Sequence, residues 1–466
     1  MELDSNTSRR DFVRMLVAGI GALYIPRWSW AFSNVHKPEA DPHFFLQIFV
    51  QGGLDPSYFF DARPLEMTAA GKIQNYTGED PQVWKGANGG QCLATKIMDP
   101  LLPFKDKFSI LNGVVMSSSL DGHDQCENLM LTGDAFGGES FVPSFNRVGS
   151  QRKEEMPLDA IQSGTLFANL NNVSRIIPLS SASAAIIAEK LKKSKPFDLK
   201  SPLLNFLHAR MEKNGGGKGR FSNGSLAMAE GFETSPIISE RLLKASGDFK
   251  ATTEEGKFVE MLGSFFLNGI TRCGILSLAG NDLSNVDCHD AASAKKMPAM
   301  AKEVVTRVSN IFKGLQDTPY DANRSLLDVT TVMFASEFSR TMRITGSKID
   351  ETGTNHNALN NSIWLGGKGI RGGCVFGASD GTDAKMELSA AHKAVDSEMV
   401  KIMGKPFDFT NGIPKDDLPA TYDATHYLNI ASVMNTLFTS FDVPTAMHRS
   451  ATRNGAPAPI LKQLLI

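Results

Sequence analysis

The stretch HFFLQIFVQGGLD, residues 43–55, decides the fold of this 466-residue chain. Its run FFLQIFV is apolar except for one glutamine, and the pair Gly52-Gly53 follows it closely. A short apolar run closed by glycine is typical of a strand that is buried on both faces. We therefore expect residues 44–50 to form a fully buried first strand, with Asp55 in the loop after it.

Three later stretches have the same strand-like character: KFSILNGVV (107–115), RCGILSLAGN (272–281) and DVTTVMFASEF (328–338). Between the last two, residues 294–317 carry apolar side chains at the period of a helix. Strands that alternate with helices form βαβ units, so the sequence predicts an α/β fold with a mainly parallel sheet. A further helix is expected within 418–438, with Asp423 as its N-cap.

Two stretches are expected to be insertions in a single domain that spans residues 34–466. Residues 60–100 are rich in Gly, Asn, Thr and Pro, which favours a long excursion over the active face. Residues 186–260 combine an amphipathic helix, a basic run and the segment KNGGGKGR, which favours a helical cap. The lysines there could attract an anionic substrate, although such runs are usually solvated helix faces.

Residues 1–33 have the features of an export signal. A polar start and the pair Arg9-Arg10 precede a short apolar run from Met15 to Leu23, and small residues follow. The run is shorter than the roughly 20 apolar residues of a transmembrane helix, so no stable transmembrane helix is expected in the mature form. The box SRRDFVR resembles a twin-arginine signal. We expect the twin-arginine export machinery of a bacterium as a partner, and a periplasmic or secreted location.

Charge and cysteine content narrow the class of protein. The formal net charge is −2, so the chain has no strong basic field and nucleic-acid binding is not expected. The five cysteines are an odd number without a CxxC pair, which argues against a zinc ribbon or a dense disulfide framework. One or two disulfides remain open as an alternative.

Polar residues suited to chemistry come shortly after the predicted strands. They are Asp55, His123, Asp287 and Glu337. Ligands of open α/β sheets bind at the carboxyl ends of the strands. We therefore expect a binding or catalytic site at this edge of the sheet.

The segment NDLSNVDCHD (281–290) offers a metal-ligand pair. Side chains alternate along an extended backbone, so Asp287 and His289 share one face, and such a pair suits Zn, Mn or Fe. The alternative is a polar loop in which an aspartate caps the next helix. His356, in TGTNHNALNNS (352–362), could complete the site, because the small and amide residues around it can line a polar pocket.

Two further segments each allow a functional and a structural interpretation. In ASEFSRT (335–341), Glu337 and Arg340 form a local ion pair, or Glu337 binds metal while Arg340 clamps a phosphate or sulfate. In DGHDQCENLMLTG (121–133), His123 is a polar residue at a helix start, or it takes part in chemistry. Spacing alone leaves both alternatives open.

The stretch LGGKGIRGG (365–373) contains the spacing GxGxxG, but we do not expect a dinucleotide site. It follows the strand-like SIWL and precedes the strand-like CVFGAS, whereas a dinucleotide-binding loop opens a helix. A glycine-rich hairpin turn is the better prediction.

Motifs along nearly the whole mature chain resemble those of a known family. They are SRRDF, GGLDP, HDQCENLMLTG, VDCH, SEFSRT, TNHN, GGKGIRGGCVFG and PATYD. This order resembles the exported "domain of unknown function 1501" (DUF1501) proteins, which are similar to sulfatases and to the alkaline phosphatase superfamily. The resemblance implies a three-layer α/β/α sandwich with an alkaline-phosphatase-like fold and two metal ions near a nucleophile.

The resemblance also implies roles for individual residues. Five look like ligands of divalent metal ions: Asp55, Asp287, His289, Glu337 and His356. The ion would be Zn, Mn, Ca or Mg. His123 stands where phosphodiesterase-like relatives place a Thr or Ser nucleophile, and it could act as ligand, general base or nucleophile. Arg340 would counter the charge of the transition state.

Two departures from the family pattern keep a second function open. Pro56 replaces the usual glycine after Asp55, and Asn355 replaces the aspartate of TDHG, which removes a negative charge from a cation site. The leading hypothesis is an exported metal-dependent hydrolase of phosphate or sulfate esters, which acts on an anionic small molecule or an envelope polymer. The alternative is a non-catalytic envelope protein that keeps the fold as a binding scaffold.

Overall fold

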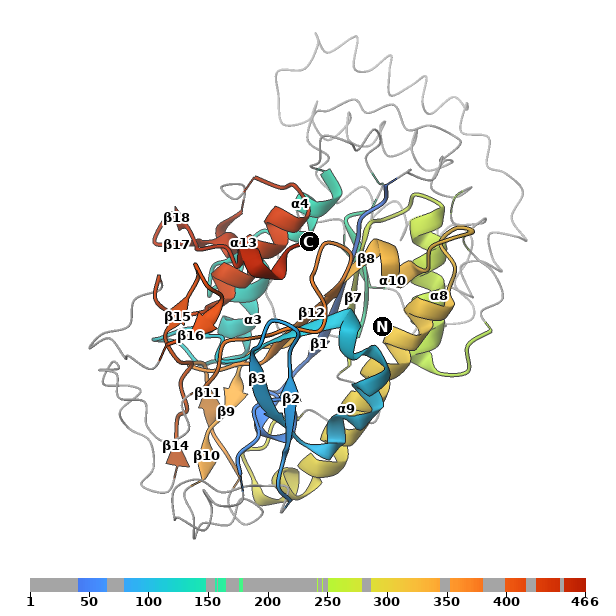
Figure 1. Ribbon diagram of the computed structural model, residues 1–466. Coiled ribbons are helices and arrows are strands. Elements are labelled where there is room, and N and C mark those ends of the chain that lie inside the picture. The colour runs from blue at the N-terminus through green and yellow to red at the C-terminus, as the bar shows by residue number, and fades with distance from the viewer. Residues whose placement is uncertain are drawn as a thin grey trace, which may run out of the picture.

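The structure is a computed structural model, shown as a ribbon in Figure 1. It describes residues 41–64, 79–147, 156, 158–164, 176–178, 241, 245, 250–278, 286–343, 353–379, 399–415, 425–444 and 448–466. The predicted export signal at 1–33 and most of the predicted cap at 186–260 lie outside these ranges.

An eight-stranded sheet forms the centre of the fold, in the order β13-β4-β12-β8-β1-β7-β5-β6. Its strands are β1 (Phe44–Val50), β4 (Phe108–Leu111), β5 (Ala160–Ser163), β6 (Ile176–Pro178), β7 (Cys273–Ser277), β8 (Thr330–Ser336), β12 (Ile363–Gly367) and β13 (Val375–Phe376). Neighbouring strands are parallel except at β12, which runs antiparallel to β4 and β8. The prediction of an α/β fold with a mainly parallel sheet is confirmed.

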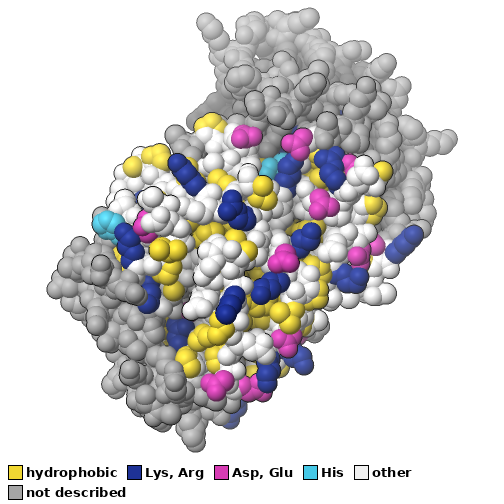
Figure 2. Space-filling model, viewed as in Figure 1, with side chains coloured by type: hydrophobic (Ala, Val, Ile, Leu, Met, Phe, Trp, Pro, Cys, Tyr) yellow, Lys and Arg dark blue, Asp and Glu magenta, His cyan; other side chains and the backbone are white. Residues whose placement is uncertain are grey.

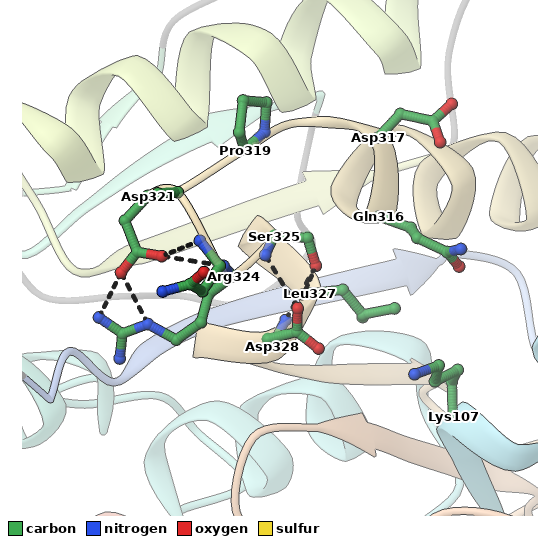
Figure 3. A pocket seen from close by; sticks show the side chains of 11 residues that line it. Lys107, Gln316, Asp317, Pro319, Asp321, Arg324, Ser325, Leu327 and Asp328 are labelled. Atoms are coloured by element: carbon green, nitrogen blue, oxygen red, sulfur yellow. Dashed lines mark hydrogen bonds and ion pairs between the residues drawn. The ribbon is translucent and has the colours of Figure 1, made fainter.

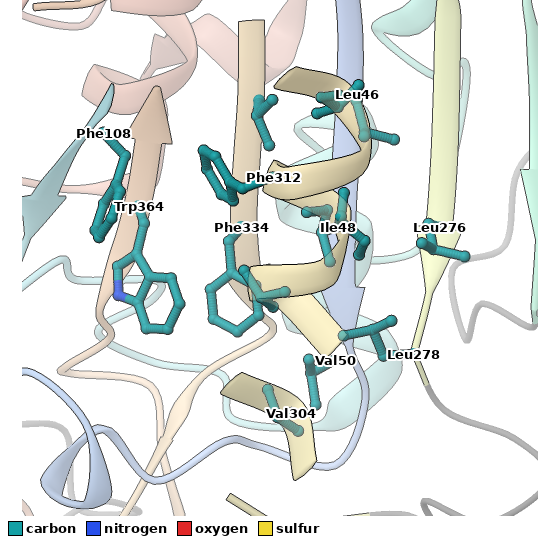
Figure 4. Close-up of a cluster of buried hydrophobic side chains, with 14 of the residues drawn as sticks. Leu46, Ile48, Val50, Phe108, Leu276, Leu278, Val304, Phe312, Phe334 and Trp364 are labelled. Carbon is teal, nitrogen blue, oxygen red and sulfur yellow. The ribbon is translucent and has the colours of Figure 1, made fainter. Parts of the chain in front are cut away.

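The central strand β1 explains why the sequence there is apolar at nearly every position. It pairs with β7 on one side and β8 on the other, and all seven residues are buried. Successive side chains point to opposite faces, so Leu46 and Ile48 enter one core while Phe45 and Phe49 enter the other. Figure 4 shows the first core, where Leu46 and Ile48 lie among aromatic and aliphatic side chains that include Phe334.

Helices cover both faces of the sheet and give three layers (Figure 1). The core on the Leu46 face includes residues of α8 (Glu254–Leu267), α9 (Ala291–Asp317) and α10 (Leu326–Val329). The core on the Phe45 face includes residues of α3 (His123–Thr132), α4 (Val142–Arg147) and α13 (Ile430–Ser440). Asp290 caps α9 by accepting a hydrogen bond from the Ser293 N–H, as the structural interpretation of residues 281–290 anticipated.

Short elements complete the fold. They are η1 (Pro56–Tyr58), β2 (Gln82–Lys85), β3 (Gln91–Ala94), η2 (Lys96–Lys107), β9 (Ser339–Arg340), β10 (Met342–Arg343), β11 (His356–Asn357), β14 (Met399–Val400), β15 (Phe407–Asp408), β16 (Ile413–Pro414), η4 (Arg449–Ala451), β17 (Thr452–Arg453), β18 (Ala456–Pro457) and η5 (Lys462–Leu464). Within the stretch 60–100, β2 and β3 pair as an antiparallel ladder, which the sequence analysis did not anticipate. Trp84 of β2 packs on Phe60 with ring centroids 4.9 Å apart.

Two predictions of local structure are wrong. The stretch 365–373 is not a hairpin turn, because β12 and β13 pair with opposite sides of β4 rather than with each other. The helix α13 has Asn429 as its N-cap, and this side chain accepts a hydrogen bond from the Ser432 N–H. The proposed cap Asp423 lies outside the described residues. Periodicity does not reveal either feature. The pairing of β12 and β13 with β4 is a tertiary contact, and the cap at Asn429 is a local hydrogen bond of one side chain.

All five cysteines are free thiols, so no disulfide contributes to the fold. Among the described residues, no helix is both long and apolar enough to cross a bilayer. On the face of the molecule seen in Figure 2, basic and acidic side chains are interspersed, in keeping with the net charge of −2.

Candidate metal centre

Three segments that follow strands of the sheet meet at one place. His123 is the first residue of α3, after β4, while Asp287 and His289 lie between β7 and α9. His356 begins β11, which pairs antiparallel with β9 just after β8, so that His356 lies opposite Arg340. The chain thus brings together side chains that are separated by up to 233 positions in the sequence, between His123 and His356.

The structure places one potential ligand atom of each of His123, Asp287, His289 and His356 within 4.8 Å of the others. The Nε2 atoms of His289 and His356 are 2.7 Å apart, and His289 Nε2 is 3.3 Å from Asp287 Oδ1. His123 Nε2 lies 3.4 Å from Asp287 Oδ2. Imidazole nitrogens and a carboxylate suit zinc and neighbouring transition metals better than Ca²⁺ or Mg²⁺, which prefer oxygen ligands. This cluster could therefore hold a metal ion.

Glu337 lies behind His123, on the side away from the cluster. Its Oε1 is 2.5 Å from His123 Nδ1, and the side chain of Glu337 is completely buried. A carboxylate at Nδ1 favours the tautomer that carries its proton there, which leaves the lone pair of Nε2 to face the cluster. Such a carboxylate is typical of histidines that bind metal.

The carboxylate of Glu337 also accepts hydrogen bonds from the loop after β1. Glu337 Oε1 also accepts hydrogen bonds from the Gly52 N–H at 2.7 Å and the Gly53 N–H at 3.0 Å, and Ser336 Oγ donates to Oε2 at 2.9 Å. Both carboxylate oxygens therefore have partners within the protein. Glu337 was expected to be a ligand, and the structure places it next to a potential ligand.

Arg340 holds Asp287 in place, as Glu337 holds His123. The guanidinium is buried, and its Nη2 donates to Asp287 Oδ1 and to the Gly52 carbonyl. Its Nε donates to the Gly53 carbonyl at 3.0 Å, and Nη1 lies 3.5 Å from His289 Nε2. Glu337 and Arg340 thus each bond to Gly52 and Gly53, one through the N–H groups and the other through the carbonyls.

The charges of the cluster shift the pKa of three residues. Burial opposes the charge on His123, but hydrogen bonds to Asp287 and Glu337 outweigh it and raise the pKa to about 9. Burial likewise opposes the charge on Asp287, yet His123 and Arg340 hold the pKa of that carboxyl well below its usual range. Burial, followed by the positive charge of Arg340, lowers the pKa of His356 to about 4. His356 is therefore neutral and able to bind metal at pH 7.

The cluster is open to solvent on the side of His289. The side chain of His289 is 44% exposed and that of Asp287 is 24% exposed, while Glu337 behind them is fully buried. A small molecule can therefore reach the potential ligands from one side. The aromatic ring of Phe338 covers another side, with its centroid 4.8 Å from that of His123 and 4.5 Å from that of His356.

Asp55 does not belong to this group of ligand atoms. Its Oδ1 accepts a hydrogen bond from the Ser57 N–H and caps η1, whose first residue is Pro56. Its Oδ2 is buried without a hydrogen-bond partner, and burial raises the pKa of Asp55 to about 6. Asn355, the other departure from the family pattern, is exposed, and its N–H donates to Thr341 Oγ1.

Sequence reasoning missed the two glycines as functional residues. Gly52 and Gly53 have positive φ angles of 107° and 67°, which glycine adopts at little cost. A Cβ on Gly53 would lie 2.3 Å from the Phe338 ring, so only glycine allows this close approach. The signal was present in the pair of glycines after the first strand, which we interpreted only as the end of the strand.

A separate surface hollow of about 400 Å³ lies at the end of α9 and is not part of the cluster (Figure 3). Arg324 in this hollow pairs with Asp321 through Nε at 2.8 Å and Nη2 at 2.6 Å. Asp328 accepts hydrogen bonds from Ser325. These charged groups face one another, so the hollow is a weaker candidate than the cluster.

The fold and the cluster define a mixed α/β protein with a His/Asp site at the ends of its strands. Residues 287–404 match the model of a family described as "Protein of unknown function (DUF1501)". The matched range begins at Asp287 and contains His289, Glu337, Arg340 and His356, whereas His123 precedes it. A search of curated proteins found no match.

Proposed function

We propose that this protein is a metal-dependent hydrolase of phosphate or sulfate esters, built on an alkaline-phosphatase-like fold and exported by the twin-arginine route. The observation that carries the proposal is that one potential ligand atom from each of three imidazoles and from the Asp287 carboxylate lies within 4.8 Å of the others. Buried groups hold two of these ligands from behind, Glu337 at His123 and Arg340 at Asp287. Such supporting contacts are a regular feature of metal sites.

The residues present fit a zinc-like ion better than Ca²⁺ or Mg²⁺. His123, His289, His356 and Asp287 would hold it, and it would supply Lewis-acid activation of an ester oxygen and of water. The solvent-exposed side of His289 gives a substrate access. Esters of phosphate and sulfate are the favoured class because a bound cation attracts a tetrahedral anion and can polarise its ester oxygen.

The protein groups around the ligands have distinct tasks in this proposal. Glu337 keeps the proton of His123 on Nδ1, so that Nε2 stays available to the ion. His356 remains neutral because burial and the charge of Arg340 lower its pKa to about 4. His123 is protonated at pH 7 because its pKa is about 9, so it would have to give up a proton to hold the ion.

The test combines metal analysis with turnover. Purified protein, prepared without chelator, is analysed for bound metal and assayed with nitrophenyl phosphate, bis(nitrophenyl) phosphate and nitrophenyl sulfate. We expect bound transition metal and hydrolysis of at least one ester, with both lost in His289→Ala. His426→Ala is the matched control, because His426 is exposed and lies outside the cluster. Protein that binds no metal and hydrolyses none of the esters would refute the proposal.

A non-catalytic scaffold is the second candidate, and one observation favours it. The positive charges of Arg340 and protonated His123 balance the carboxylates of Asp287 and Glu337, so the network can be neutral without an ion. A scaffold would be folded, free of transition metal and inactive toward all three esters. The same experiment therefore separates the two candidates.

A further inference from the structure

Arg340 occupies the space beside Asp287 that a second cation would need. Its Nη2 bonds to Asp287 Oδ1, and its Nη1 approaches His289 Nε2 to 3.5 Å. Its guanidinium also donates to the carbonyls of Gly52 and Gly53 in the turn after β1. With 2% of its surface exposed, the side chain has no room to swing into solvent.

A guanidinium cannot bind a metal ion, because it carries five N–H donors, no acceptor and a permanent positive charge. It therefore repels any divalent ion placed next to it on the Asp287 side. Asp287 Oδ1 is already engaged by Arg340, and Oδ2 is the oxygen that faces His123 Nε2. The carboxylate thus has one oxygen left for an ion.

The carboxylates of Glu337 and Asp55 do not belong to the group of ligand atoms. Both oxygens of Glu337 accept hydrogen bonds from the protein, and Asp55 is not among the grouped ligand atoms. Among the described residues, a single group of ligand atoms is close enough together to surround an ion. The single group of ligand atoms has room for one ion, and the positive charge of Arg340 beside Asp287 disfavours a second.

We infer that the site holds one divalent transition-metal ion per chain and that Arg340 takes the place of a second cation while it orients Asp287. The inference rests on the proposed metal site and deepens it, because it sets the number of ions and assigns Arg340 as a positioning residue rather than a direct anion clamp. The family resemblance implied two metal ions instead.

The number of ions is measured directly. Metal-free full-length protein is titrated with Co²⁺, the visible absorption of Co²⁺ is recorded, and native mass spectrometry counts the ions retained. We expect saturation at one equivalent. Two equivalents would overturn the inference while leaving a metal-dependent hydrolase intact, and no binding would refute the proposed function itself.

The role of Arg340 has its own variant and control. In Arg340→Gln, Asp287 loses the guanidinium that donates to its Oδ1, so we expect the visible spectrum of bound Co²⁺ to change in position or intensity. Arg324→Gln removes a surface guanidinium paired with Asp321 and should leave the spectrum unchanged. An unchanged spectrum in a folded Arg340→Gln protein would refute the positioning role. If that variant does not fold, Arg340→Lys keeps the charge without the planar fork and is judged by the same change in the spectrum.

Discussion

At the scale of the residue, His123 and Glu337 form a close contact in the candidate site, at 2.5 Å between Nδ1 and Oε1. The carboxylate raises the affinity of the imidazole for a proton and for a metal ion alike. The proton and the metal ion compete for His123, so metal binding should strengthen as the pH rises. At neutral pH the proton occupies His123, because its pKa is about 9.

We expect the apparent metal affinity of the wild type to rise about tenfold per pH unit from pH 7 to pH 9, because one proton leaves His123. Above pH 9 the affinity levels off. In Glu337→Gln, the pH at which the metal affinity levels off should be lower, because the anion that raises the pKa of His123 is gone. The affinity on this plateau should fall by about 10- to 100-fold. Zinc titration against a chromophoric chelator at several pH values measures the pH dependence and the plateau affinity of the wild type and the variant.

Glu303→Gln is the control for this experiment, since Glu303 pairs with Arg307 on α9, away from the ligand group. Its pH profile should match that of the wild type. An affinity that is independent of pH between 7 and 9 would contradict the assigned protonation of His123.

Asp55 leads to a prediction about stability. Its pKa in the folded protein is about 6, above the value of about 3.9 in an unfolded chain, because the carboxyl is buried. The folded state therefore holds the proton more tightly, and stability falls as pH rises from about 4 through 6. Above pH 7 the charged form costs roughly 3 kcal/mol.

Asp55→Asn should recover part of this free energy, because an amide oxygen can still accept the Ser57 N–H. We expect the free energy of unfolding to rise by about 1 to 3 kcal/mol at pH 8 and to change little at pH 4. Urea unfolding of chelator-treated protein at both pH values is the measurement. A variant that is less stable at pH 8 would show that the charge of Asp55 has a partner that stabilises it.

At the scale of the element, the turn after β1 joins the two halves of the site. Gly52 and Gly53 give their N–H groups to Glu337 and their carbonyls to Arg340, so one turn holds the partners of both His123 and Asp287. The positive φ angles of both glycines aim these groups in the required directions.

Gly53→Ala should therefore be costly. Its Cβ would meet the Phe338 ring at 2.3 Å, and φ is +67°, so we expect a loss of at least about 3 kcal/mol in the free energy of unfolding. Gly89→Ala is the matched control: φ is +80°, but nothing lies within 4 Å, so only the backbone cost of about 1 to 2 kcal/mol remains. Equal losses in chemical unfolding would show that the contact with Phe338 is unimportant.

The elements also show how far the sequence predicts the fold. The strands near 44–50, 107–115, 272–281 and 328–338 are present as β1, β4, β7 and β8, because a strand that is buried on both faces is largely apolar. The hairpin expected at 365–373 is absent, since β12 and β13 flank β4. Pairing partners depend on contacts between distant segments, which local periodicity does not contain.

At the scale of the whole molecule, the ligands connect three separate parts of the chain. They follow β4, β7 and β8, and one ion bound to them would hold these parts together. An ion that binds the folded state alone stabilises it by about 2.7 kcal/mol at one hundred times its Kd. The thermal unfolding temperature should therefore rise with Zn²⁺ and fall again when chelator is added.

His289→Ala should lose most of this shift, whereas His426→Ala should retain it. Differential scanning calorimetry of the metal-free protein, with and without added Zn²⁺, is the measurement. A shift of the same size in both variants would indicate that the ion binds elsewhere.

The sequence by itself determined the layered α/β architecture and the types of residue available for chemistry, because burial and strand periodicity are written locally in each segment. Only the tertiary structure decided how the polar groups pair. Glu337 and Arg340, three positions apart, were candidates for an ion pair with each other, yet Glu337 holds His123 and Arg340 holds Asp287. The physical reason is that an ionic or hydrogen-bonding group finds its partner in space, and the turn at Gly52 and Gly53 sets which groups can meet there.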